Sequence, residues 1–338
     1  MKRALITGIS GQDGAYLSKL LLDEAYEVFG AHRISSRNTN WRLQELGIAD
    51  RVKMVPFDML DTLEAVRTLQ RIKPTEIYNL GAHSFVASSF QQPVHTAEVD
   101  ALGVVKLLEV IRTVDDSIRF YQASSSEMFG SAVACPQSEE TPFHPRSPYG
   151  VAKLFGHWTT VNYRETYGMH ASSGILFNHE SPLRGEEYVT RKIARSLARL
   201  KLGLQDSITL GNLDAQRDWG YAGDYVKGMW LMLQRAEGDD YVLSSGVPHS
   251  VRQFVEAAAH CVGLEIEWCG AGLDSYGMDA KSGKKVVTVS EEFYRPPEKT
   301  QLLGNPEKAK RNLGWKPEVD FQQLIEMLVK RELERASA

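Results

Sequence analysis

The sequence predicts an α/β fold in which a doubly wound parallel sheet, covered by helices on both faces, is joined to a second, smaller domain. In the first half of the chain, short runs rich in β-branched and aromatic residues alternate with segments long enough for helices. Parallel strands need such crossover helices because the chain must return over one face of the sheet before the next strand begins. A length of 338 residues suits one large domain and one smaller domain.

Six segments are expected to form the strands of this Rossmann-type sheet: 3–7, 27–31, 52–57, 76–80, 118–123 and 172–177. After about Asn178 the chain breaks into turn-rich pieces, with helices expected at 189–202, 222–236, 251–262 and 321–334. We therefore assign 1–178 to the first domain, to which the chain returns around 214–248, and 179–338 mainly to a second, mixed α/β domain. Residues 270–285, rich in Gly, Ser and Lys, are expected to form a mobile surface loop.

The composition excludes several classes of protein. Hydrophobic residues make up 43% and charged residues 24% of the chain, and the net charge of -4 is spread without blocks, which argues against nucleic-acid binding. No apolar run reaches the roughly 18 residues of a membrane helix, and the start MKRALITGISG lacks the long apolar stretch of a signal peptide. The three cysteines form no CxxC pair, so we expect neither disulfides nor a metal site, but a cytoplasmic protein.

A glycine-rich turn follows the first predicted strand and leads into an apolar helix. Glycines let the backbone turn sharply and approach a diphosphate, which then lies at the positive end of that helix. The spacing GxxGxxG is a weak signal alone, since such a turn is often only a turn, but its place at the first strand-to-helix junction favours a dinucleotide. The turn contributes these candidate cofactor-binding residues: Gly8, Ser10, Gly11, Gln12, Asp13 and Gly14.

The end of the second predicted strand indicates which dinucleotide is bound. An enzyme that recognises a free ribose hydroxyl usually has an acid about 20 residues beyond the glycines. Here Arg33 stands in that region, with Arg37 close by, and a positive charge at this place favours NADP(H). The alternative is an arginine in a solvated loop. Residues after the third and fourth strands are expected to line the adenine and ribose, although each alone is equally typical of a turn: Asp58, Met59, Leu80, Gly81, Ala82 and Ser84.

Tyr149 and Lys153 give the strongest chemical signal. A spacing of four residues places both side chains on one face of a helix, downstream of the polar end of the fifth strand. A tyrosine titrates at about 10 and is a poor base unless a nearby cation stabilises its phenolate, which Lys153 can do. Alone, the pattern is equally typical of a packed aromatic beside a solvated lysine. Combined with the glycine-rich turn, it predicts a catalytic pair.

These residues resemble the extended short-chain dehydrogenase/reductases, and several strings are similar to one family within them. ITGISGQDGAYL, PTEIYNLGA, PFHPRSPYGVAKL, GILFNHESPLRG and LGNLDAQRDWG resemble the GDP-mannose 4,6-dehydratase family. The resemblance runs over nearly the whole chain and weakens only around 270–285. It implies a homodimer or homotetramer in which residues 35–41 reach towards a neighbouring subunit, and a second domain that binds a nucleotide-sugar.

The resemblance also implies an internal redox cycle in which NADP(H) is regenerated and GDP-mannose becomes GDP-4-keto-6-deoxymannose and water. Tyr149 would be the base, Lys153 its partner and Glu127 the carboxylate acting at carbon 5, while Ser125 occupies a position that is usually Thr. The resemblance places His179 and Arg184 near the cofactor. The residues implied near the substrate are Ser84, Ser125, Glu127, Asn178, Glu180, Lys192, Gly211, Arg217, Arg295 and Glu298.

Two departures from the family pattern leave alternatives open. The family generally has two arginines where this chain has Arg33 and Ile34, and Gln where it has His83. The substrate could therefore be a related GDP-sugar such as a GDP-manno-heptose. An NADPH-dependent 4-keto reductase or epimerase of a nucleotide sugar would use the same Tyr149 but would not need Glu127. A catalytically silent NADP(H)-binding protein on the same fold is the remaining alternative.

Overall fold

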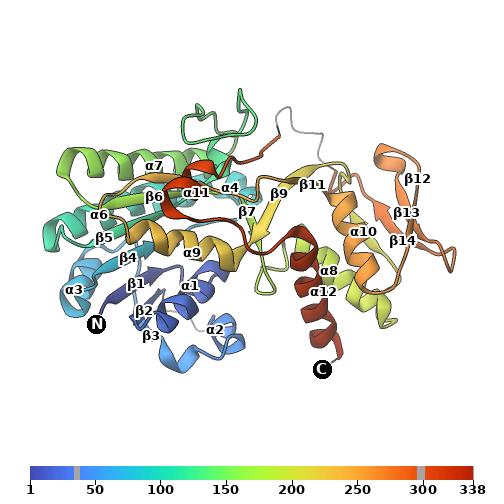
Figure 1. The fold of residues 1–338 in the computed structure, drawn as a ribbon, viewed down its shortest axis with the longest axis horizontal. Coiled ribbons are helices and arrows are strands. Elements are labelled where there is room, and N and C mark those ends of the chain that lie inside the picture. Colours follow the sequence, from blue (N-terminus) through green and yellow to red (C-terminus); the bar gives the residue numbers. More distant parts are fainter. Residues whose placement is uncertain (34–38, 295–300, 338) are drawn as a thin grey trace.

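A parallel sheet forms the centre of the larger part of the molecule (Figure 1). The computed structural model describes residues 1–33, 39–294 and 301–337. Within these residues the sheet has seven strands, all parallel, in the order β10-β6-β5-β4-β1-β2-β3. The six predicted strands are confirmed, and β10 is added to them. Their bounds are β1 Arg3–Thr7, β2 Glu27–His32, β3 Lys53–Pro56, β4 Glu76–Asn79, β5 Arg119–Ser125, β6 Ala171–Leu176 and β10 Asp240–Leu243.

Helices cover both faces of this sheet, which confirms the doubly wound fold. Successive residues of β1 point to opposite faces: Ala4 and Ile6 belong to one apolar core and Leu5 to the other, and all three are fully buried. The first core lies beneath α1 Gln12–Asp23, α9 Ala222–Leu233 and α11 Glu307–Leu313. The second core lies beneath α3 Thr62–Ile72, α6 Gly103–Val114 and α7 Pro148–Tyr167.

Short elements connect these strands and helices. η2 is a π-helical turn that leads into α6 and packs against α7. The bounds of the short elements are α2 Trp41–Glu45, η1 Ala49–Arg51, α4 Val86–Gln91, α5 Pro93–Ala97, η2 Glu98–Leu102 and η3 Ser126–Met128.

The smaller part has its own core, built mainly from the second half of the chain. Ile193, Trp219, Phe254 and Leu328 are fully buried in it and come from four different elements. The predicted helices are confirmed as α8 Val189–Lys201, α9, α10 Val251–Cys261 and α12 Phe321–Ser337. In the described residues, two small sheets complete this part: β11-β9-β7 and β12-β13-β14-β8. Their bounds are β7 Asn178–Glu180, β8 Ile208–Leu210, β9 Gln216–Tyr221, β11 Pro248–Ser250, β12 Ile266–Cys269, β13 Tyr276–Asp279 and β14 Lys285–Val289.

The prediction of a mobile surface loop at 270–285 is wrong. The segment contains the 3-10 turn η4 Gly272–Asp274 and the strand β13, which lies between β12 and β14 in their sheet. Gly277 permits this packing, because a Cβ atom there would stand 2.8 Å from the Ile266 side chain. A glycine that reads as a sign of flexibility is therefore a site of close contact between strands.

The chain crosses between the two parts more than once. After β9 it re-enters the larger part as α9, which packs against α1, and as β10, which pairs with β6. The large sheet changes direction between β1 and β4, whose chain connections leave to opposite sides. In such sheets ligands bind outside the carboxyl ends of the strands at this point. Within the described part of the chain, none of the helices is both long enough and apolar enough to cross a membrane.

Candidate active site

The glycine-rich turn lies at this switch point. Gly8 has a φ of +68°, and a Cβ atom there would stand 2.7 Å from the carbonyl carbon of Leu80 in the neighbouring strand connection. Gly11 precedes α1 as its N-terminal cap without a capping side chain, so the first N–H groups of the helix remain available to an anion. The turn is therefore shaped to bring backbone close to a phosphate group.

Two adjoining hollows lie over the ends of the strands and share Gly8 and Ala82. The first, of about 240 Å³, extends from the glycine-rich turn to α7. The second, of about 200 Å³, extends over the ends of β2 and β3. All the predicted cofactor residues line one hollow or the other. The first holds Gly8, Gly11, Gln12, Asp13, Gly14, Leu80, Ala82, Ser84, Tyr149, Lys153, His179 and Arg184, and the second holds Ser10, Arg33, Asp58, Met59 and Gly81.

The predicted catalytic residues converge on the first hollow from two elements. Ser125 ends β5, and Glu127 follows it in η3, with its N–H donating to the Ser125 hydroxyl at 3.2 Å. Ser147 caps α7 by accepting from the N–H of Gly150 at 3.0 Å, which places Tyr149 in the first turn of the helix and Lys153 one turn later. A Cβ atom on Gly150 would lie 2.7 Å from the carbonyl oxygen of Glu127. Glycine thus allows the two elements to meet.

Burial decides the protonation of the tyrosine–lysine pair. Burial raises the pKa of Tyr149 above its ordinary value, the nearby Asp100 adds to this, and the Ser125 hydroxyl acts in the opposite direction. Burial also lowers the pKa of Lys153, although Asp100 and Asp13 oppose that change. The Lys153 ammonium donates to the carbonyl oxygen of Ala123 at 3.0 Å and lies 5.7 Å from the centre of the Tyr149 ring. The cation is near, but the protein alone holds Tyr149 as a neutral phenol.

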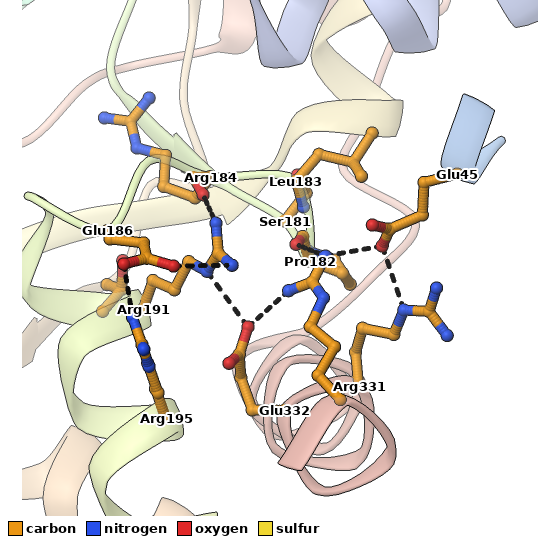
Figure 2. A network of polar contacts seen from close by, with 12 residues as sticks. Glu45, Ser181, Pro182, Leu183, Arg184, Glu186, Arg191, Arg195, Arg331 and Glu332 are labelled. Atoms are coloured by element: carbon orange, nitrogen blue, oxygen red, sulfur yellow. Dashed lines mark hydrogen bonds and ion pairs between the residues drawn. The ribbon is translucent and has the colours of Figure 1, made fainter. Parts of the chain in front are cut away.

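An irregular segment, residues 181–187, contributes Arg184 to the lining of the first hollow. Arginines from three elements bind three consecutive carbonyl groups of it: Arg335 of α12 donates to Pro182 at 2.8 Å, Arg42 of α2 to Leu183 at 2.7 Å, and Arg191 of α8 to Arg184 at 2.6 Å. Figure 2 shows the surrounding network, in which the buried Glu332 binds Arg191 at 3.0 Å. We call these three contacts the arginine clamp.

The clamp fixes the side chain of Arg184 at the hollow. Its Nε lies 3.1 Å from Oε2 of the buried Glu180, and its guanidinium stacks on the Tyr188 ring at 3.5 Å from the ring centre. Glu180 also accepts from the Thr190 hydroxyl at 2.6 Å. Glu180, predicted near the substrate, thus lies behind Arg184 rather than among the residues that line the hollows.

The other predicted substrate residues fall into three groups. Asn178, like Ser84, lines the first hollow. Lys192 and Gly211 lie away from both hollows but meet at Phe293: the Lys192 ammonium is 4.1 Å from the ring centre, and a Cβ atom on Gly211 would lie 2.1 Å from the Phe293 carbonyl oxygen. Arg217 lies on β9, also outside the two hollows. Arg295 and Glu298, with Arg37 and most of 35–41, lie outside the described residues.

Some lining residues carried no signal in the sequence. Tyr188 lines the first hollow from just before α8, and His95 and Val99 line the second from α5 and η2. None belongs to a motif with recognisable spacing, because their positions depend on how distant segments pack. His83, noted only as a departure from the family pattern, also lines the second hollow.

Solved structures share this architecture. A dTDP-glucose 4,6-dehydratase from Bacillus anthracis, in complex with NAD, superposes with a TM-score of 0.82 at 18% identity, covering 100% of this chain and 98% of that one. RMD from Pseudomonas aeruginosa, complexed with NADPH, superposes with a TM-score of 0.79 at 23% identity, covering 99% and 100%. This chain shares the fold of these two dinucleotide-bound proteins.

Sequence comparison identifies the family. The model of the GDP-mannose 4,6 dehydratase family matches residues 5–328. A GDP-mannose 4,6-dehydratase from Sinorhizobium fredii is 50% identical, over 98% of this chain and 97% of its own length. A human GDP-mannose 4,6 dehydratase is 48% identical, over 98% and 91%. The chain belongs to the GDP-mannose 4,6-dehydratase family, as its motifs predicted.

The shape of the glycine-rich turn generates a stability prediction. Gly8→Ala should destabilise the protein by about 3 kcal/mol or more, since it combines a positive φ with a clash against backbone. Gly47→Ala is the matched control, because Gly47 has a φ of +67° but nothing within 4 Å of its would-be Cβ atom. It should cost only about 1 kcal/mol. Urea denaturation measures both free energies of unfolding, and equal losses would show that the contact with Leu80 carries no strain.

Proposed function

We propose that this enzyme converts GDP-mannose into GDP-4-keto-6-deoxymannose and water, and that Tyr149, Lys153, Ser125 and Glu127 carry out the proton transfers. The observation that carries the proposal is that one hollow contains both a tyrosine–lysine pair and the carboxylate of Glu127, two residues beyond Ser125. A simple reductase needs the first pair only. A dehydratase needs a further base for the carbon-bound proton.

The proton transfers follow from the positions of these side chains. Tyr149 takes the proton of the 4-hydroxyl, and Ser125 beside it orients that hydroxyl. The ketone formed at carbon 4 acidifies the proton on carbon 5, which Glu127 removes. The same proton then leaves with the 6-hydroxyl as water, which restores Glu127. When hydride returns to carbon 6, carbon 5 takes up one proton, which balances the proton that Tyr149 took from the 4-hydroxyl and restores Tyr149. A bound nicotinamide dinucleotide would supply the hydride acceptor at carbon 4 and the donor at carbon 6.

The two hollows fit a nicotinamide dinucleotide. Gly8 and Ala82 join them into one cleft across the switch point, and the uncapped start of α1 faces a diphosphate at its middle. We propose NADP(H), because Arg33 lines the second hollow directly after β2, and the described end of that strand carries no acid. The larger part would then hold the cofactor. The smaller part, with Lys192, Gly211 and Arg217, would hold most of the nucleotide-sugar.

We also propose that the protein forms a homo-oligomer and that it is cytoplasmic. The proposed location rests on the cysteine pattern alone. Val151, Phe155 and Trp158 project from one face of α7 and are 56%, 49% and 55% exposed. The groove beside them is lined largely by apolar residues of α5, η2 and α7. An apolar surface of this kind is typical of an interface, and a second copy of the chain would cover it.

The decisive test of the function is Glu127→Gln, which keeps the shape of the side chain but removes the base. With GDP-mannose, loss of water should fall by at least about 10²-fold, while oxidation at carbon 4 survives and the reduced dinucleotide accumulates on the enzyme. Tyr149→Phe is the matched comparison and should leave the dinucleotide oxidised. Mass spectrometry of the sugar and absorbance of the reduced nicotinamide report the two steps. Normal dehydration by Glu127→Gln would refute the role of Glu127 as the base, whereas an unmodified enzyme that releases no water would favour a 4-keto reductase or epimerase.

Cofactor preference is tested at Arg33. Arg33→Ala should weaken NADPH binding by about tenfold or more and leave NADH binding nearly unchanged, since a charge-assisted contact to the 2′-phosphate is lost. Arg51→Ala, which removes an exposed arginine outside both hollows, is the control. Titration with both dinucleotides measures the ratio. An unchanged ratio in Arg33→Ala would refute this assignment of the phosphate site.

The proposed interface is tested by placing a charge on α7. Phe155→Glu should shift the protein to the 37.9 kDa of a single chain, because the carboxylate would be buried against a partner. Leu63→Glu, at a site on α3 that is 67% exposed, should leave the mass of the assembly unchanged. Light scattering distinguishes the two outcomes. An unmodified protein that is already a monomer at micromolar concentration would contradict the proposal.

A further inference from the structure

An acid stands where an incoming diphosphate would be repelled. Asp13 lies in the first turn of α1 and lines the first hollow. Its carboxylate meets His179 of β7, with Oδ2 2.8 Å from Nε2 of the ring. The His179 ring is buried and stacks on Tyr225, with ring centres 4.6 Å apart. His179 therefore already interacts with the charge of Asp13 before any ligand binds.

The partners of His179 fix its protonation. Nδ1 lies 2.7 Å from the carbonyl oxygen of Phe177, and Nε2 faces the Asp13 carboxylate. A carbonyl and an ionised carboxylate can only accept, so both ring nitrogens must donate, and only the imidazolium carries a proton on both. Burial by itself would lower the pKa of His179, but Asp13 outweighs it and raises that pKa above its ordinary value. Likewise, burial would raise the pKa of Asp13, but His179 lowers it.

Other groups around the pair leave this conclusion intact. Arg184 opposes the positive charge of His179 but, like Lys153, favours the ionised form of Asp13. The charged and titratable groups that face the pair come from five elements: Arg184 from the 181–187 segment, Tyr225 from α9, Lys153 from α7, Tyr121 from β5 and Arg42 from α2.

The pair is also one of several ties between the glycine-rich turn and the strand end opposite. Gln12 donates to the carbonyl oxygen of His179 at 3.1 Å and accepts from the Ser181 hydroxyl at 2.6 Å. The side chains between Gly11 and Gly14 thus point towards 179–181 and leave the backbone N–H groups of the turn to the ligand. Two walls of one hollow are joined through Gln12 and Asp13.

We propose that His179 is a positioning residue held as an imidazolium. It cancels the charge of Asp13 and ties the glycine-rich turn to β7. The cleft therefore accepts the diphosphate of a dinucleotide only while His179 is protonated. The inference rests on the proposed function in that a nicotinamide dinucleotide is the ligand. Because the pKa of His179 is raised in the folded protein, the favourable pairing is complete below the ordinary pKa of histidine. It is lost as the pH rises through the raised value.

The experiment compares two ligands across pH. NADPH carries the diphosphate and the nicotinamide riboside, whereas 2′-AMP carries the adenosine and 2′-phosphate alone, so the ratio of their affinities removes the contribution of the adenosine end. Calorimetric titration from about pH 6.5 to about pH 9.5 should show this ratio falling as His179 loses its proton. His179→Gln leaves Asp13 buried without its cation, and NADPH should bind about tenfold or more weakly at neutral pH with 2′-AMP little changed. The double variant Asp13→Asn with His179→Gln should regain most of the affinity and lose the pH dependence.

His157→Gln is the matched control. His157 is also a buried histidine, on α7, and its Nδ1 lies 3.1 Å from the Ser124 hydroxyl. The ratio of affinities should not change in this variant. An affinity ratio that stays flat with pH in the unmodified protein, which needs no variant to fold, would overturn the inference. So would a double variant that binds NADPH as weakly as His179→Gln. Failure of the unmodified protein to bind any dinucleotide would instead overturn the proposed function, and the inference with it.

Discussion

The arginine clamp is the constraint on which the shape of the cleft depends. An irregular segment that packs against other elements must find donors for its carbonyl groups, because an unpaired buried carbonyl costs about 1–3 kcal/mol. Here Pro182, Leu183 and Arg184 find theirs in three arginines from helices far apart in the sequence. Arg42 also donates to the carbonyl oxygen of Ser10 at 2.8 Å. A single guanidinium therefore joins the clamped segment to the glycine-rich turn.

The acids of the clamp and the cleft differ in how many cationic side chains bind them. Glu332 is nearly fully buried, and it is bound by both Arg191 and Arg335. Nearer the cleft the pairs are single: Glu180 with Arg184, and Asp13 with His179. A buried pair adds little net stability, but removing one partner leaves an uncompensated charge, which is strongly destabilising. Such pairs therefore specify one arrangement of the cleft walls more than they stabilise the fold.

The sequence predicted what local chemistry determines. The strand, glycine-rich turn and helix at 3–23, and the tyrosine–lysine spacing on α7, are local features, and they locate both ends of the first hollow. β10 was missed because its four residues take their place from pairing with β6, some 65 residues earlier. The positions of Tyr188 and of Lys192 beside Phe293 depend likewise on packing between distant segments. The prediction of a loop at 270–285 was wrong because the role of Gly277, close contact with Ile266, becomes visible only in three dimensions.

The pKa of Tyr149 shows how far the protein alone prepares its chemistry. From sequence, Lys153 was expected to make the tyrosine a ready base. In the structure burial and Asp100 raise the pKa of Tyr149, and the proton remains on the phenol. Burial also lowers the pKa of Lys153, while Asp100 and Asp13 oppose that change. Tyr149 must therefore lose its own phenolic proton before it can take one from the substrate, and the positive charge of an oxidised nicotinamide would favour that loss. Burial thus couples the base strength of Tyr149 to occupancy of the cleft. Desolvation keeps the phenol protonated in the free protein. It would also strengthen the effect of the ligand's positive charge, because electrostatic interactions grow as water is excluded.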